Sequence, residues 1–97
     1  MLELVRAGGN YRLVGDLTVH SARQGYENSP EFTGPVCQMD LERVRDLDSA
    51  GLALLVYWYN RAAGSSCRLE FLNVPDKLAQ IAEMGGLGAI FGVTGDG

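Results

Sequence analysis

Cysteine and histidine, the residues that most often mark redox or metal sites, are nearly absent from this chain. The only cysteines are Cys37 and Cys67, which do not form a C-x-x-C pair, and the only histidine is His20. Two cysteines are too few for a disulfide scaffold, so we expect both to be buried free thiols in a reducing compartment. Because His20 has no cysteine or second histidine at ligand spacing, we expect no metal and no cofactor.

Basic residues and long hydrophobic runs are also scarce. Eight Lys and Arg stand against twelve Asp and Glu, which gives a formal net charge of -4, and the basic residues do not cluster. Phosphate binding relies on clustered cations, so this balance argues against a nucleic-acid partner or an anionic membrane surface. The longest apolar run, residues 51–59, is shorter than the roughly 20 residues of a membrane-spanning helix. The first residues lack the pattern of a signal peptide.

What is present is the composition of an ordinary globular protein, with 46% hydrophobic and 21% charged residues. A chain of 97 residues is expected to form a single domain, residues 1–97, with little room for a large internal cavity. Two short alternating runs, residues 2–6 and 11–15, are separated by Gly and Asn and predict a β-hairpin. In the segment that follows, a short helix over residues 19–24 would be ended by Gly25 and Pro30.

The second half of the chain has clearer patterns. Apolar strands are predicted over residues 36–41 and 68–72, and the strongest helix is predicted over residues 50–63. A further helix follows Asn73 and ends at Gly85. The order of elements predicts an α/β fold with a small mixed sheet of about four strands, in which residues 36–40 and 68–72 are parallel neighbours. Such neighbours would bring the two cysteines close together.

The helix over residues 50–63 has two apolar faces. At about 100° per residue, one side should face the sheet; it carries Leu52, Leu55, Val56, Tyr59 and Ala63. The other side carries Leu54, Tyr57, Trp58 and Arg61. Trp, Tyr and Arg dominate interface hot spots, and an exposed apolar patch often marks a docking site, so we predict that this outer face binds a partner. The alternative is that Trp58 packs beneath the first or the C-terminal helix as ordinary core.

Ser49 stands at the start of this helix, where it would be exposed to a partner. Either Asp48 or Ser49 can cap the helix by accepting a hydrogen bond from a free backbone N–H. We do not expect Ser49 to be catalytic, since no glycine precedes it as in a nucleophile elbow and nothing pairs it with His20. The glycines form no phosphate-binding fingerprint. The sequence therefore does not predict an enzyme.

Two segments together resemble the signature of the STAS-domain family (sulfate transporter and anti-sigma factor antagonist). They are Met39-Asp40-Leu41 and the run Leu47-Asp48-Ser49-Ala50-Gly51-Leu52. In that family a strand ends in Asp-Leu, and a later Asp-Ser/Thr-x-Gly-Leu opens the main helix; residues 69–74 resemble its last internal strand. The resemblance implies the STAS (SpoIIAA-like) fold. One departure is the first helix, a clear amphipathic element in the family that is interrupted here by Gly25 and Pro30.

Residues 51–55 most resemble the MlaB-like branch of the family, the small cytoplasmic STAS subunits of the Mla system. That resemblance implies a non-enzymatic subunit that binds the ATPase of a bacterial ABC transporter. This transporter moves phospholipids between the two membranes and maintains lipid asymmetry in the outer membrane. The subunit would be cytoplasmic and held at the inner membrane through its partner. Its contact would be made by the N-terminus and outer face of the helix, that is by Asp48, Ser49, Ala50, Leu54, Tyr57, Trp58 and Arg61.

A second branch fits Ser49 equally well. In the anti-sigma factor antagonists, the serine at this place is phosphorylated by a partner kinase. The alternative implied by the resemblance is therefore an antagonist that is switched by phosphorylation of Ser49, with an anti-sigma factor serine kinase as its partner. A small protein that binds a nucleotide or another ligand is a third class.

Overall fold

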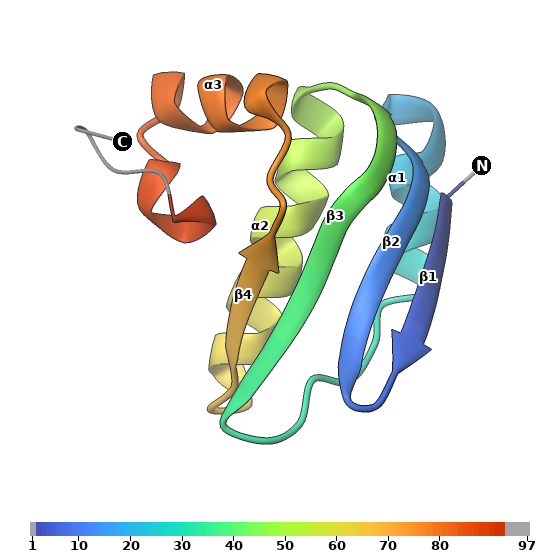
Figure 1. Cartoon of the computed structure of the whole chain (residues 1–97), viewed down its shortest axis with the longest axis vertical. Helices are drawn as coiled ribbons and strands as arrows, with labels where there is room; N and C mark the ends of the chain where they lie inside the picture. The colour runs from blue at the N-terminus through green and yellow to red at the C-terminus, as the bar shows by residue number, and fades with distance from the viewer. Residues whose placement is uncertain (1, 93–97) are drawn as a thin grey trace.

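The computed structural model describes residues 2–92 and consists of a four-stranded sheet with helices packed on one face and at one edge (Figure 1). The elements follow in the order β1 (Leu2–Ala7), β2 (Asn10–Leu17), α1 (Val19–Glu27), β3 (Val36–Leu47), α2 (Ser49–Gly64), β4 (Arg68–Leu72), α3 (Asp76–Met84) and the 3-10 helix η1 (Gly88–Phe91). Helices α1 and α2 cover one face of the sheet, and α3 and η1 lie beside β4. No helix in residues 2–92 is long and apolar enough to cross a membrane.

The sheet confirms the predicted α/β architecture. Its strand order is β1-β2-β3-β4; β1 and β2 are antiparallel, and the other two pairs are parallel. The parallel pairing of β3 with β4 runs from Val36 opposite Arg68 to Asp40 opposite Leu72, as the sequence predicted. Each parallel connection passes through a helix, which places α1 and α2 next to each other.

Strand β3 is longer than the predicted segment of residues 36–41. It continues to Leu47 because its pairing with β2 continues, with Gly15 opposite Val44 and Leu17 opposite Leu47. The charged residues of this extension, among them Arg43 and Arg45, are exposed. A strand covered on one face tolerates such side chains on the other, so charged residues can lie within a strand that extends beyond its apolar part.

The prediction that Gly25 ends the first helix was wrong. Helix α1 runs through Gly25 to Glu27. A side chain on residue 25 would overlap the Leu54 side chain of α2, so glycine is what allows the two helices to approach this closely. Gly25 therefore serves helix packing rather than helix termination, and its position opposite Leu54 cannot be read from the local sequence.

The outward placement of Leu54 and Trp58 was also wrong. Leu54 is 0% exposed and Trp58 is 1% exposed. Both side chains lie on the side of α2 that faces α1 and the segment after it. The indole Nε1 of Trp58 donates a hydrogen bond of 2.9 Å to Ser29 Oγ, in the segment after α1. Ala63, which was predicted to face the sheet, is exposed, and the neighbouring Ala62 is buried instead. The alternative interpretation of Trp58 as core is thus the correct one.

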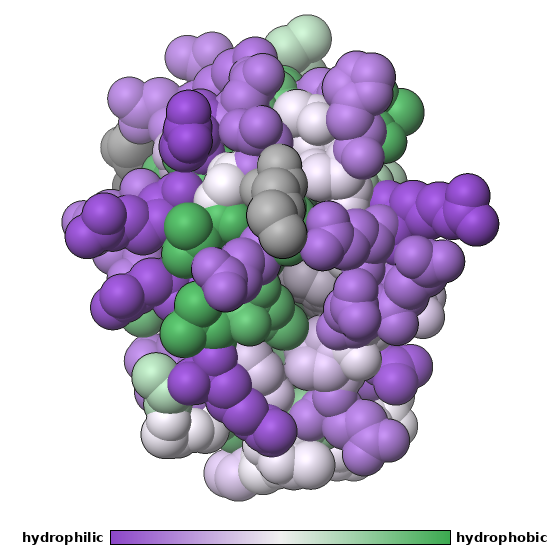
Figure 2. Space-filling model, turned by 90° about the vertical axis from the view of Figure 1, so that its right-hand side faces the viewer, coloured by the Kyte–Doolittle hydropathy of each residue, from purple (hydrophilic) through white to green (hydrophobic). Residues whose placement is uncertain are grey.

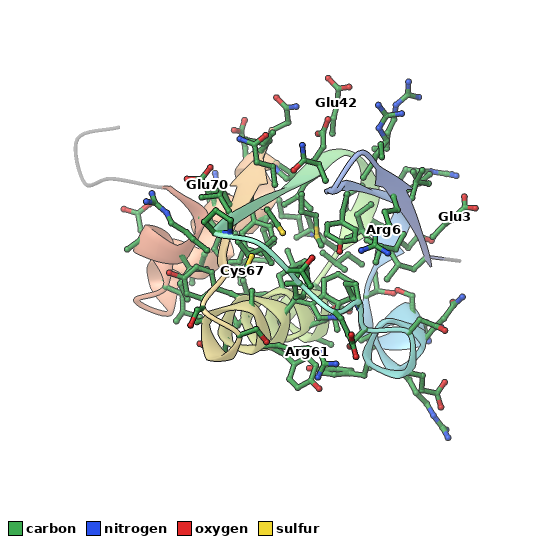
Figure 3. The ribbon with its side chains drawn as sticks, turned by 90° about the horizontal axis from the view of Figure 1, so that it is seen from below. Glu3, Arg6, Glu42, Arg61, Cys67 and Glu70 are labelled. Atoms are coloured by element: carbon green, nitrogen blue, oxygen red, sulfur yellow. The ribbon has the colours of Figure 1, made fainter. Side chains whose placement is uncertain are left out.

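The two cysteines lie together in the core, as their predicted places on neighbouring strands implied. Cys37 and Cys67 are buried free thiols with their Sγ atoms 3.3 Å apart, and Cys67 is labelled in Figure 3. Cys37 Sγ also donates to the Thr33 carbonyl at 3.1 Å. Burial, followed by the hydrogen bond with Cys37, raises the pKa of Cys67 to about 11.

Beyond α3 the chain folds back on the sheet. Phe91 of η1 is buried and stacks on Phe71 of β4, with ring centroids 4.8 Å apart. Leu78 and Ala82 of α3 are buried in the same core. This packing holds η1 beside β4, with a groove of about 290 Å³ between them.

Candidate partner-binding surface

The site predicted from the sequence centres on Asp48 and Ser49, where the first turns of α1 and α2 meet. Asp48 is the N-cap of α2: its Oδ1 accepts hydrogen bonds from the N–H groups of Ala50 at 2.9 Å and Gly51 at 3.1 Å. Its Oδ2 accepts a third, of 2.9 Å, from the N–H of Val19 in α1. The hydrogen bond from Val19 is the main cause that lowers the pKa of Asp48, followed by those from Gly51 and Ala50.

Gly51 fixes the first turn of α2 against the sheet. A side chain there would overlap the carbonyl oxygen of Leu17 at the end of β2. The Asp-Ser-Ala-Gly segment thus combines a cap at Asp48 with a close approach of backbone at Gly51. Both features serve to place Ser49, which is the first residue of α2 and is exposed.

Exposed side chains continue from Ser49 along the outside of α2. Ala53, Tyr57 and Arg61 follow at intervals of one helical turn, and all three are exposed. Arg61, seen in Figure 3 at the foot of α2, donates from Nε to the Pro30 carbonyl at 3.1 Å. Of the other predicted contact residues, Ala50 is half-buried. Both carboxylate oxygens of Asp48 already accept hydrogen bonds from backbone N–H groups.

Helix α1 adds two exposed side chains that the sequence did not suggest. Val19 is 62% exposed, and Tyr26 is 40% exposed next to Tyr57, which is 41% exposed. The rings of Tyr26 and Tyr57 are 5.0 Å apart between centroids. We call the surface formed by Val19, Tyr26, Ser49, Ala53, Tyr57 and Arg61 the α1–α2 ridge. The sequence predicts that the first helix ends at Gly25, so that prediction does not include Tyr26, which lies one residue further along α1.

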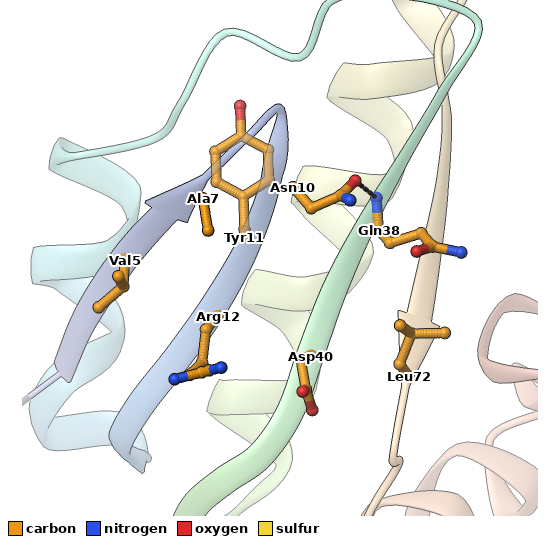
Figure 4. A pocket seen from close by; sticks show the side chains of 8 residues that line it. All are labelled: Val5, Ala7, Asn10, Tyr11, Arg12, Gln38, Asp40 and Leu72. Carbon is orange, nitrogen blue, oxygen red and sulfur yellow. Dashed lines mark hydrogen bonds between the residues drawn. The ribbon is translucent and has the colours of Figure 1, made fainter.

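A different kind of candidate site, a pocket, lies on the face of the sheet that the helices leave open (Figure 4). It has a volume of about 300 Å³ and is lined by Val5, Ala7, Asn10, Tyr11, Arg12, Gln38, Asp40 and Leu72. A hydrogen bond from Asn73, and then one from the Glu42 N–H, lower the pKa of Asp40. The lining contains no histidine, cysteine or serine, and Asp40 is its only carboxylate. Among residues 2–92 there is also no cluster of three or more His, Cys, Asp or Glu side chains that could hold a metal ion.

Solved structures of an anti-sigma factor antagonist and of a sulfate transporter family protein share this fold. The anti-sigma factor antagonist SpoIIAA in its unphosphorylated form superimposes with a TM-score of 0.66 at 18% identity, covering 88% of this chain and 84% of that one. SpoIIAA from Bacillus in its phosphorylated form gives 0.63 at 17% identity, over 94% and 88% of the two chains. A sulfate transporter family protein from Wolinella succinogenes gives 0.63 at 22% identity, over 86% and 71%. At these identities the likeness shows the fold alone.

The sequence comparison shows the family. No curated protein sequence matches this chain. The family model described as "Mlab, STAS domain" matches residues 2–93 of the 97. Members of the STAS family are in general non-enzymatic domains that regulate or bind other proteins. Because the match covers nearly the whole chain, the chain belongs to the STAS-domain family.

Proposed function

We propose that this chain is the STAS subunit of a phospholipid ABC transporter of the Mla type and that it binds the transporter's ATPase through the α1–α2 ridge. The family model supports the transporter branch, since its description names the Mlab type. The binding surface is supported by one observation above all. An exposed serine at the start of α2 lies two helical turns before Tyr57, which forms an exposed pair with Tyr26.

The chemistry of this ridge suits a protein partner. Tyrosine and arginine are frequent hot-spot residues because they combine apolar area with a polar tip. The middle of the ridge, formed by Tyr26, Ala53 and Tyr57, carries no charge. Charged side chains flank it, with Arg61 at one end and the exposed pair of Arg23 and Glu27 on α1. An uncharged centre with a polar rim is the usual composition of an interface. In this role the protein needs no cofactor and carries out no reaction, and it would be held at the inner membrane only through the ATPase.

The alternative is an anti-sigma factor antagonist in which a serine kinase phosphorylates Ser49. It is favoured by the exposure of Ser49 and by the fold shared with SpoIIAA, for which a phosphorylated form is known. A phosphate on Ser49 would lie at the N-terminus of α2, where the free N–H groups favour negative charge. The fold itself would therefore accept the modification. The two functions differ in the partner rather than in the surface.

The test is a titration of the protein against the ATPase of its own transporter. Ser49→Glu is expected to stay folded but to bind at least about tenfold more weakly, because its charge, next to Asp48, must lose water at the interface. Ser49→Ala should have a smaller effect. Gln80→Glu on α3 is exposed and adds the same charge away from the ridge, so it is the matched control. Undiminished binding by Ser49→Glu would remove Ser49 from the interface. Capture of a serine kinase in place of the ATPase would favour the antagonist.

A further inference from the structure

We propose that the outer edge of β1 is a second interaction surface, which binds an extended segment of a partner protein as a fifth strand of the sheet. The α1–α2 ridge does not include β1. The proposal therefore does not depend on the function proposed above and can be tested separately.

The outer edge of β1 is unpaired within the part of the chain that the structure describes. The strand order places β1 and β4 at the two edges of the sheet. Beside β4 lies η1, with Phe91 stacked on Phe71. No strand within residues 2–92 pairs with the outer side of β1, which is six residues long. Unpaired N–H and C=O groups along such an edge form a template for another strand.

The hairpin turn determines which residues offer these groups. Gly8 and Gly9 have φ values of 58° and 88° and form a two-residue turn between Ala7 and Asn10, which are paired. In such a hairpin the pair that flanks the turn exchanges both hydrogen bonds, and bonded and non-bonded pairs then alternate. The backbone groups of Leu2, Leu4 and Arg6 therefore point away from β2, toward the open edge.

A groove lies next to these residues, between β1 and α1. It has a volume of about 390 Å³ and is lined by Leu2, Glu3, Leu4, Gln24 and Asn28. Beneath it, a smaller cavity of about 30 Å³ extends to Gly25 and Trp58. Figure 2 shows hydrophobic side chains grouped on this side of the molecule and framed by hydrophilic ones. The groove is thus placed to accept side chains that an added strand would direct toward the helices.

The charges along β1 determine which segment fits. Arg6 is exposed, and its guanidinium lies 5.7 Å from the centre of the Tyr11 ring. Glu3 is exposed at the other end of the strand (Figure 3). An antiparallel segment would therefore need an acidic residue opposite Arg6, apolar residues opposite Leu4 and Leu2, and a basic residue opposite Glu3. The partner is an extended peptide of the pattern acidic–x–apolar–basic–apolar.

A second copy of this chain does not supply that pattern. In a symmetric antiparallel pair of β1 strands, directly opposite side chains share one face of the sheet, so each residue opposes one an even number of positions away. Glu3 and Arg6 are separated by an odd number of positions and can never be opposite each other. Charge complementarity thus favours a different protein as the partner.

The probe is the peptide Glu-Thr-Leu-Lys-Leu with Gly-Ser at each end. In a titration followed by ¹⁵N–¹H NMR, the amide signals of β1 should shift, and the amides of Leu4 and Arg6 should become protected from hydrogen exchange. A methyl group on the backbone nitrogen of the peptide's first Leu, which faces β1, should weaken binding by at least about tenfold. The same methyl group on Lys, which faces away, should have no effect. This pair of peptides separates strand addition from simple apolar contact.

Charge reversal provides the second arm of the test. Arg6→Glu should weaken binding by about threefold, and a peptide with Lys in place of Glu should restore it. Arg45→Glu, an exposed change on β3, is the control and should leave binding unchanged. Equal binding of the two methylated peptides, or no change at β1, would overturn the proposal. Self-association through β1 in sedimentation experiments would overturn it in favour of a second copy. Because no transporter component is used, failure here would leave the ATPase proposal unaffected.

Discussion

Asp48 Oδ2 lies 2.9 Å from the backbone nitrogen of Val19, so a residue that caps α2 also accepts from the first residue of α1. The other oxygen of the same carboxylate accepts from Ala50 and Gly51. Two helices that are separated by the whole of β3 in the sequence therefore begin at one side chain. The position of Ser49 depends on this arrangement.

Replacing Asp48 should destabilise both helix starts. Asp48→Ala removes three hydrogen bonds to a charged acceptor, and we expect the free energy of unfolding to fall by about 1–3 kcal/mol. Asp76→Ala, in the first turn of α3 where no side chain caps the helix, is the control and should cost at most about 0.5 kcal/mol. Urea unfolding followed by circular dichroism measures both. Equal effects of the two changes would contradict the double cap.

The stabilisation by Asp48 should depend on pH. Its pKa is lower in the folded protein than the ordinary value of 3.8, because the carboxylate accepts N–H groups from Val19, Gly51 and Ala50. The contribution is therefore complete above pH 3.8 and is lost as the pH falls through the lower, folded pKa. The difference in stability between the wild type and Asp48→Ala should shrink over that acidic range. A difference that stays constant with pH would show that the carboxylate charge is not involved.

Tyr57 and Trp58 are adjacent but should respond in opposite ways to truncation. Trp58→Ala removes a buried side chain and should lower the free energy of unfolding by about 3–5 kcal/mol. Tyr57→Ala should cost only about 1 kcal/mol of stability, through loss of the Tyr26 contact, but about 2 kcal/mol of partner binding. Met84→Ala, at an exposed site on α3, is the binding control. Normal ATPase affinity of Tyr57→Ala would exclude Tyr57 from the interface.

Gly25→Ala tests the close approach of α1 and α2. The added methyl group would meet Leu54, and we expect a loss of about 1–3 kcal/mol despite the better helix propensity of alanine. Gly64→Ala is the matched control, because nothing lies within 4 Å of its added carbon, and it should be neutral or stabilising. The double variant Gly25→Ala, Leu54→Ala should lose less than the sum of the single changes. Additive losses would mean that the two residues do not contact each other.

Much of the fold could be predicted from the sequence because its signals are local. The hairpin turn, the parallel strands around Cys37 and Cys67 and the start of α2 all follow from patterns within a few residues. The errors concern Gly25, Leu54 and Trp58, whose roles depend on contacts between α1 and α2. A helical wheel separates two faces of α2, but it does not say that a second helix covers part of the outer one. The exposed position of Ser49 at the start of α2 could be predicted, whereas that of Tyr26 could not.

The cysteine pair predicts slow thiol chemistry in the folded protein. Both thiols are buried, so a thiol reagent at neutral pH should modify them slowly in the native state and completely after unfolding, to a total of two equivalents. The pKa of Cys67 is raised from 9.0 to about 11, so its contribution to stability should be lost as the pH rises from 9.0 to about 11. Subtracting the pH profile of Cys67→Ala isolates this effect. Rapid modification of both thiols in the native protein would contradict the observed burial.

The contact between Tyr26 and Tyr57 joins side chains from two different helices, and this limits what a partner can recognise. The paired rings exist only where α1 is docked on α2, and both glycine at residue 25 and the hydrogen bond between Asp48 and Val19 stabilise that arrangement. A synthetic peptide covering α2 alone would lack half of the aromatic surface, and so would a nascent or partly unfolded chain. A partner that binds this surface would therefore recognise only chains in which α1 and α2 are already docked.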